Sequence, residues 1–293
     1  KIYDSLLFQK KNCDIPEVEN DEHYSPEQVL DLISKKIKEH ITENMRLDSR
    51  NLLDYREIKI TPSLLPKANG SALVEIGDTK VLAGVKFEMG SPFPDTPNEG
   101  VLMVSGEILP ISSVTKEPGP PTEQEIELSR VVDRGIRESK MVELGKLVVV
   151  PGEKVLKMFV DFSVIHDSGN LLDATALAAV TALYVTKGPS IKELRDDESA
   201  DIYTVKQIAL KVKDIPITVT VSNICGKLLV DATSEEESAI NSKLTVTHKD
   251  NDDICSMQKA GKEGIHYDDI FKILDIAKEL SKDLRSKIKK AVK

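Results

Sequence analysis

Three arginines are spaced so that they could follow a row of phosphate groups. Arg130, Arg134 and Arg137 stand at i, i+4 and i+7, which places them on one stripe of a helix. Each guanidinium offers forked donors to anionic oxygens, so such a row suits a phosphate backbone. Because Asp133 and Glu138 flank the row, an ordinary solvated helix face is the alternative, and spacing alone favours it.

An acidic run offers a second possible chemistry, the binding of a divalent cation. The run spans residues 231–237, and Asp231 and Glu237 at its ends could converge on the kind of metal ion that phosphoryl transfer needs. A polar turn between two strands is the alternative. The spacing favours the turn, so the sequence assigns no metal ligand in this chain.

Other common signatures of catalysis are weak or missing. Gly169 precedes a predicted helix whose free N–H groups could bind phosphate, but Asn170, Leu171 and Leu172 bring no cation and favour an ordinary helix start. The five histidines share no spacing suited to a metal, and none adjoins an obvious nucleophile. The sequence has no G-x-x-x-x-G-K-S/T, no G-x-G-x-x-G after a strand and no G-x-S-x-G, so the usual signs of nucleotide hydrolysis, dinucleotide redox chemistry and serine esterases are missing.

These residues would be positioned by two strand-rich stretches, each followed by helix. A first helix is expected over residues 25–45. Strands are then predicted at 57–60, 72–76, 80–88, 101–109, 147–150 and 155–165, with helices over 122–144 and 171–185. Further strands at 202–208, 215–222, 227–230, 241–248 and 254–259 precede a last helix over about 268–290. The pattern predicts an α+β fold of two halves packed together.

Composition limits the class of protein. The 293 residues carry 40 Lys and Arg against 49 Asp and Glu, a net charge of −9, which argues against a general DNA coat but allows a local basic patch. No apolar stretch reaches the roughly 18 residues of a membrane span. Three widely separated cysteines exclude a disulfide framework and favour a reducing, cytoplasmic location. Residues 1–24 are expected to form a poorly ordered arm or a docking segment.

Several segments together resemble the RNase PH superfamily, most closely the non-catalytic RNase PH-like subunit of the archaeal exosome core. They span the chain from about residue 25 to 293 in the order and spacing of that family. The segments are Arg46-Leu47-Asp48-Ser49-Arg50, Asn69-Gly70-Ser71-Ala72-Leu73-Val74, Gly77-Asp78-Thr79-Lys80-Val81-Leu82-Ala83-Gly84, Glu117-Pro118-Gly119-Pro120-Pro121, Glu127-Leu128-Ser129-Arg130-Val131-Val132-Asp133-Arg134 and Gly169-Asn170-Leu171-Leu172-Asp173-Ala174. Ser49 departs from the family's Arg-x-Asp-Gly-Arg pattern, which usually has glycine there.

The resemblance implies an RNase PH-like fold of two similar β-α-β-α halves, of the type seen in ribosomal protein S5 domain 2. It also divides the chain. The expected parts are the arm 1–24, an N-terminal helix at 25–45, a first RNase PH-like half at 46–195, and a second half with a C-terminal helix at 196–293.

The resemblance also implies a chemistry that this chain lacks by itself. Active relatives use inorganic phosphate to cleave RNA from its 3′ end, and they carry Gly followed by Ser/Thr-Arg where this chain has Asn170 and Leu171. They also tend to carry arginines where this chain has the segment 122–124, Thr-Glu-Gln. Asp231 and Glu237 fall near the catalytic acidic positions, but two acids without an anion site do not make a phosphorolytic centre. We therefore expect no catalytic residue and no resident cofactor in this chain.

Finally, the resemblance implies partners. A catalytic RNase PH-like subunit would form a heterodimer with this chain, three copies of which make a hexameric ring with RNA-binding cap subunits, and would supply the site for Mg²⁺ and inorganic phosphate. Single-stranded RNA would contact Arg130, Arg134 and Arg137, so the family favours RNA binding where spacing alone does not. A self-sufficient phosphorolytic 3′-5′ exoribonuclease is the alternative function.

Overall fold

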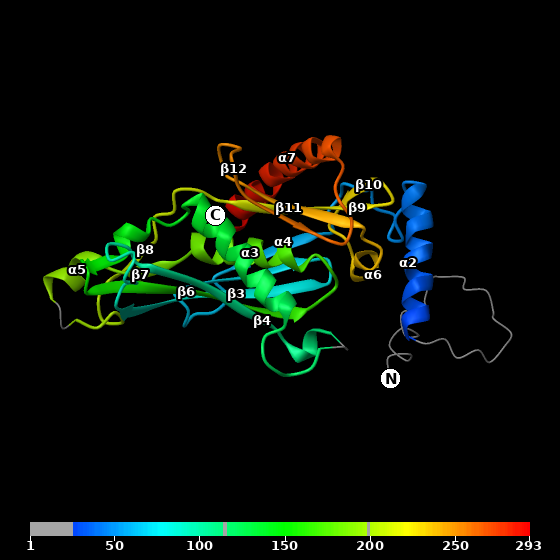
Figure 1. Cartoon of the computed structure of the whole chain (residues 1–293). Coiled ribbons are helices and arrows are strands. Elements are labelled where there is room, and N and C mark those ends of the chain that lie inside the picture. The colour runs from blue at the N-terminus through cyan, green and yellow to red at the C-terminus, as the bar shows by residue number, and fades with distance from the viewer. Residues whose placement is uncertain (1–25, 114–115, 198–199) are drawn as a thin grey trace.

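Two large β-sheets with helices between and outside them make up most of the fold, and a two-stranded sheet stands apart from them. The structure, a computed structural model, describes residues 26–113, 116–197 and 200–293, so the expected arm at 1–24 lies outside the described residues. Figure 1 shows the layers in order: the larger sheet, then α3 and α4, then the smaller sheet, and α7 on its far side. The predicted α+β class is confirmed.

The larger sheet has the strand order β1-β2-β3-β6-β4, and β5 also pairs with β6. Its strands are β1 (Ile58–Pro62), β2 (Gly70–Ile76), β3 (Thr79–Gly90), β4 (Val101–Ile108), β5 (Val148–Val150) and β6 (Lys154–His166). Neighbouring strands are antiparallel except β4 and β6, which are parallel. Alternate side chains of β2, β3 and β6 are buried, as a sheet covered on one face requires.

The helices α3 (Glu123–Ser139) and α4 (Leu171–Tyr184) form the middle layer. α4 packs against β2 and β3 on one side and β9 on the other, and α3 packs on β4, α4 and β12. The small side chains of α4 allow this close approach, and 12 of its residues are buried. The helix is therefore covered on most sides.

The smaller sheet and its helices complete the second half. Its strand order is β10-β9-β11-β12 and every pair is antiparallel. The strands are β9 (Ile217–Ile224), β10 (Lys227–Val230), β11 (Ser242–His248) and β12 (Ile254–Ala260), with the one-turn helix α6 (Ser234–Glu237) before β11. The long helix α7 (Tyr267–Ala291) packs on β9, β11 and β1.

The N-terminal helix α2 (Pro26–Thr42) is separate in sequence from the half on which it packs. Its residues Ile37 and Ile41 are buried against Ile224, Leu229 and Ala239 of the second half. Figure 1 shows α2 beside α6 and β10, at the end of the molecule away from β7 and β8. The chain thus closes on itself, because its first described helix contacts its last sheet.

Two predicted elements have wrong boundaries. α3 ends at Ser139 rather than near 144, because Lys140 adopts a left-handed conformation with φ 56° and ends the helix. The strand predicted at 202–208 begins only at Gln207, as β8 (Gln207–Ala209), which pairs with β7 (Lys187–Pro189). The segment between β7 and β8 includes α5 (Ile191–Asp196). Two short 3₁₀ turns, η1 (Pro110–Ser112) and η2 (Leu144–Leu147), complete the elements.

No helix in the described ranges is long and apolar enough to cross a membrane.

Candidate nucleic-acid interface

A firmly anchored helix carries the arginine row. Thr122 caps α3, and Glu125 completes a capping box by accepting from the Thr122 backbone N–H at 2.6 Å. Burial acts to raise the pKa of Glu125, but hydrogen bonds from Lys116, Thr122 and the Ile108 N–H lower it to about 2. The carboxylate therefore ties the start of α3 to the end of β4, which fixes the helix relative to the larger sheet.

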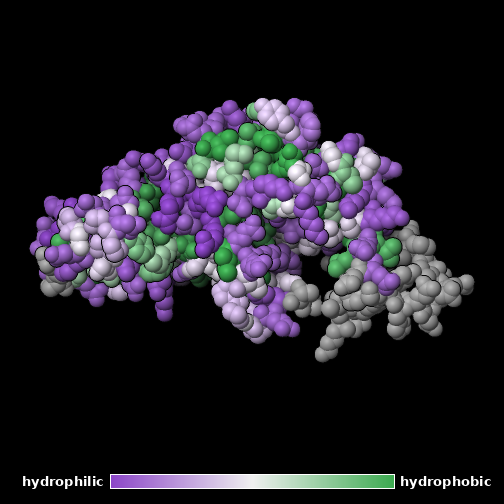
Figure 2. Space-filling model, viewed as in Figure 1, coloured by the Kyte–Doolittle hydropathy of each residue, from purple (hydrophilic) through white to green (hydrophobic). Residues whose placement is uncertain are grey.

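The arginine row lies along an open groove, here called the α3 groove. The groove has a volume of about 650 Å³ and lies between α3 and residues 102–106 of β4. Arg130, Arg134 and Arg137 all line it, so the structure brings the three predicted residues to one surface. On the opposite side of α3, Leu128, Val131, Val132 and Ile136 are buried. Figure 2 shows a strongly hydrophilic band over α3 in the middle of this face.

The three arginines differ in how far their charges are already used. Arg137 donates to the Asp133 carboxylate at 2.8 Å and to the Leu102 carbonyl oxygen at 2.9 Å. Arg134 donates one hydrogen bond, to the amide oxygen of Gln258 at 3.0 Å. Arg130 makes no hydrogen bond or ion pair with any residue that the structure describes. The order of available positive charge is therefore Arg130, then Arg134, then Arg137.

Apolar side chains lie beside this charge. Met103 of β4 and Ile126 of α3 both line the groove and remain 36% and 46% exposed. A second hollow of about 310 Å³ on the other side of the row is lined by Arg130 and Arg134 but not Arg137. Arg130 and Arg134 thus form a ridge with open space on both sides, and the apolar side chains beside it can make van der Waals contact with bases.

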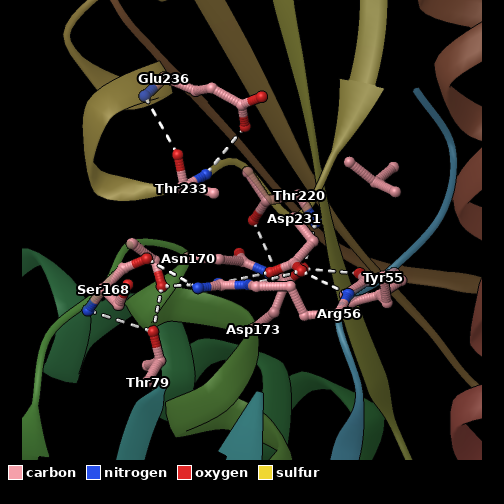
Figure 3. A network of polar contacts seen from close by, with 12 residues as sticks. Tyr55, Arg56, Thr79, Ser168, Asn170, Asp173, Thr220, Asp231, Thr233 and Glu236 are labelled. Atoms are coloured by element: carbon pink, nitrogen blue, oxygen red, sulfur yellow. Dashed lines mark hydrogen bonds and ion pairs between the residues drawn. The ribbon is translucent and has the colours of Figure 1, made fainter. Parts of the chain in front are cut away.

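The acidic residue Asp231 does not face an open metal site. Its buried carboxylate accepts hydrogen bonds from Arg50 at 2.9 Å, from the Arg56 guanidinium at 2.8 and 2.9 Å and from the Arg56 backbone N–H at 2.8 Å. The Asn170 side chain donates a further hydrogen bond at 2.9 Å. Figure 3 shows Arg56 extending past Asp231 towards Ser168 and Asn170. Two carboxylate oxygens have about four acceptor positions, so no capacity is left for a cation.

Arg56 also sets the ionisation of Asp231. Burial acts to raise the pKa of this carboxyl, but the hydrogen bonds and charge of Arg56 outweigh burial and lower it. A neighbouring pair is more deeply buried: Arg46 and Glu236 form an ion pair with side chains that are 0% and 2% exposed. Arg46 and Arg50 of the segment 46–50 therefore bind the acidic run through ion pairs with Glu236 and Asp231. The run is a turn between strands, and these arginines fix its position.

The second acid, Glu237, is turned towards the start of α4. Its carboxylate accepts the Asn170 backbone N–H at 3.0 Å, so one of the N–H groups that could bind a phosphate is already paired with an anion of the chain itself. Burial raises the pKa of Glu237. Leu171, the next residue, is buried. The remaining hollow, also lined by Glu127 and Lys243, measures only about 70 Å³.

The backbone before α4 packs closely against the acidic run. Gly169 has φ +86°, and a Cβ built on it would lie 2.5 Å from the Ala232 carbonyl oxygen and the Ser234 nitrogen. Thr79 donates to the Gly169 carbonyl oxygen at 2.7 Å. The turn at 168–170 therefore leaves no room for a ligand between itself and the acidic run. Among the described residues, no group of three or more metal-ligating residues occurs.

Two family patterns match most of the chain. The pattern of the 3′ exoribonuclease family, domain 1, matches residues 54–189, and that of domain 2 matches residues 214–279. The chain belongs to the RNase PH family. The resemblance seen in the sequence motifs is thus confirmed.

Relatives within the RNase PH family extend the match over nearly the whole chain. The exosome complex component Rrp42 of Archaeoglobus fulgidus is 43% identical over 90% of this chain and 99% of its own length. Rrp42 of Thermococcus onnurineus is 40% identical over 90% of this chain and 98% of its own length. A solved structure described as the Archaeoglobus fulgidus exosome with RNA bound to the active site has a chain with TM-score 0.82 and 42% identity, covering 88% of this chain and 98% of that one.

Sequence reasoning identified the RNase PH motifs but missed some residues that decide the chemistry. It did not single out Arg56, which comes between the first motif and β1, nor the pairing of Arg46 with Glu236. Arg46 and Arg50 belong to the first family segment, residues 46–50, so the sequence did mark these two positions. What the sequence could not show is that these cations lie against an acidic run about 180 residues later.

Proposed function

We propose that this chain is the non-catalytic subunit of an archaeal-type exosome ring. It pairs with a catalytic RNase PH-like subunit, and three such heterodimers form a hexamer that receives RNA-binding cap subunits. The near-complete coverage of relatives named exosome complex component Rrp42 supports this assignment. In the complex, the chain structures the partner's active site and positions RNA for phosphate-dependent 3′-5′ degradation. The cytoplasmic location expected from the cysteine content stays a prediction.

The occupied acidic run is the observation that carries the proposal. Asp231 is held by Arg50 and Arg56, and Glu237 takes the N–H at the start of α4. A phosphorolytic centre needs a free carboxylate pair for Mg²⁺ and a free cationic cradle for phosphate. Because this chain uses these groups internally, Mg²⁺ and inorganic phosphate would act at the partner's active site.

RNA binding is assigned to the α3 groove. Arg130 and Arg134 form no ion pair with a carboxylate of the described residues, and they face open space on both sides, which Glu138 lines on one side and Glu127 on the other. Arg137 contributes less, because Asp133 already holds it. The groove offers phosphate contacts and apolar surface but few free base-reading groups, since Ser105 on β4 donates to Asp161 at 2.7 Å. Binding would therefore depend little on RNA sequence.

The test compares RNA degradation by the heterodimer before and after charge reversal. We expect Arg130→Glu/Arg134→Glu to leave the mass of the heterodimer unchanged and to weaken degradation of single-stranded RNA in phosphate and Mg²⁺. Lys35→Glu/Lys36→Glu on the exposed face of α2 is the control, because it makes the same change in net charge outside the groove. Unchanged turnover and RNA affinity at low salt would contradict the assignment of the groove.

A second measurement tests the absence of catalysis in this chain. The purified chain alone, given single-stranded RNA, phosphate and Mg²⁺, is expected to release no nucleoside diphosphate. Release by the chain alone would instead support a self-sufficient phosphorolytic exoribonuclease. Mass measurement of the chain, alone and mixed with a catalytic homologue, tests the pairing independently of either activity.

A further inference from the structure

A hydrophobic pocket lies at the end of the molecule that carries β7 and β8, away from α2 (Figure 1). Its volume is about 160 Å³, and it shares no lining residue with the α3 groove. The buried side chains of Phe87, Leu147 and Leu156 line it together with Ile208 and Ala209 of β8, which are exposed. Hydrophobic atoms reach the surface in this part of Figure 2.

The size of the pocket matches one bulky apolar side chain. A cavity of about 150 Å³ lined by Leu, Ile and Phe is large enough to hold benzene. Apart from Glu143, Lys146 and Lys211, every side chain that lines this pocket is apolar or absent. An occupant would therefore bury a hydrocarbon group there and make its polar contacts outside.

The surroundings of the pocket are basic, against the trend of the whole chain. Lys146 and Lys213 share a single carboxylate, that of Glu143. Lys211 lines the pocket and forms no ion pair with any residue in the described ranges. The lining itself has two lysines, Lys146 and Lys211, against one glutamate, Glu143, and so a charge of about +1, whereas the chain as a whole carries −9. This local charge complements an acidic partner.

We propose that this pocket docks a segment of a partner protein that presents one Phe, Leu or Ile anchor flanked by Asp or Glu. The anchor fills the hollow, and the flanking carboxylates pair with Lys146, Lys211 and Lys213 around it. The lysine ammonium groups are exposed at the rim and spread over η2 and the segment after β8. Because Lys146 and Lys211 line the hollow and Lys213 shares Glu143 with Lys146, one short peptide segment can place its anchor in the hollow and its carboxylates on these lysines. A central apolar anchor with a charged surround is a common interface design.

Fluorescence anisotropy with the full chain and three labelled peptides tests the proposal. The first peptide has one Phe between Asp and Glu residues, the second replaces Phe by Ser, and the third replaces the acids by Lys. We expect the first to bind, the Ser peptide to bind at least about tenfold more weakly, and added salt to weaken the first. Equal binding of the Phe and Ser peptides, or binding of the Lys peptide as tight as that of the first, overturns the proposal.

Two variants of the chain localise the binding. Ala209→Trp fills the mouth of the pocket, and Lys211→Glu reverses its unpaired charge, so each is expected to weaken the first peptide by about tenfold. Lys262→Glu, in the exposed turn after β12, is the matched charge control and should leave binding unchanged. Circular dichroism checks that each variant folds. Unchanged binding in both variants refutes the site, as does self-association of the chain that Ala209→Trp abolishes, because a second copy would then be the occupant.

Discussion

The different partners of the three arginines predict different contributions to RNA affinity. We consider the alanine variants Arg130→Ala, Arg134→Ala and Arg137→Ala in the heterodimer, with RNA binding measured without phosphate or Mg²⁺ so that nothing is degraded. Each phosphate contact with a single strand contributes about 0.7 to the slope of log affinity against log salt, and hence about fivefold in affinity at 0.1 M salt.

The structure assigns these contributions unequally. Arg130 has no partner among the described residues, so Arg130→Ala should lower RNA affinity by the full amount, about fivefold. Arg134 gives up only a hydrogen bond to neutral Gln258 when it binds phosphate, so its loss should be close to that of Arg130. Arg137 is neutralised by Asp133, and Arg137→Ala should change affinity by less than about twofold. The double variant Arg130→Ala/Arg134→Ala should lose about 25-fold and flatten the salt slope by about 1.4.

Anisotropy of a labelled single-stranded RNA over a range of KCl concentrations gives both the affinity and the slope. The Arg137→Ala variant is the internal control, since it removes the same side chain from the same helix. A loss in Arg137→Ala as large as that in Arg130→Ala would refute the ranking. A salt slope that is the same in the double variant and the parent chain would refute phosphate contact by the row altogether.

Three further outcomes follow from the buried charges. Arg46→Met should cost about 3 to 5 kcal/mol in urea unfolding because it leaves the Glu236 carboxylate buried and unpaired, and a loss below about 1 kcal/mol would contradict the burial of that pair. Burial raises the pKa of Asp173 from 3.8 to about 6, so the folded chain loses stability relative to Asp173→Asn, by up to about 3 kcal/mol, as pH rises from 4 to 6. A pH-independent difference between those two chains would exclude this titration. Burial also raises the pKa of Glu237 above 4.5, so the melting temperature of Glu237→Gln relative to the parent should be higher at pH 8 than at pH 4.5, and the reverse order would contradict the buried carboxylate.

Local sequence signals predicted the elements well where one helix or strand carries its own pattern. The helix predicted from residue 122 begins with Thr122 as its N-cap, and its buried series Leu128, Val131, Val132 and Ile136 repeats at helical spacing. The end was mispredicted because Met141 and Val142 are also buried and prolong the hydrophobic pattern beyond the left-handed Lys140. Ser49 likewise adopts φ 63°, so the position keeps the turn that glycine would favour although the residue differs.

In the candidate site, too, only the part that lies within one element was predictable from the sequence. The arginine row was predictable because i, i+4 and i+7 spacing lies within one helix. The state of Asp231 and Glu237 was not, since it depends on Arg50, Arg56 and Asn170, which approach from other elements. A pair of acids in sequence has the same appearance whether it faces an ion or two guanidinium groups. Only long-range packing separates these cases.

The pairing of Arg46 with Glu236, 190 residues apart, has a consequence for biosynthesis. During synthesis, the segment with Arg46 leaves the ribosome long before Glu236, which neutralises Arg46, has been made. Until then, Arg46 of the nascent chain has no carboxylate to pair with. The strands of the larger sheet therefore form before this ion pair can join them to the second half. Completion of this subunit therefore waits for its C-terminal third, and truncated products would expose the segment at 46–56 to proteases.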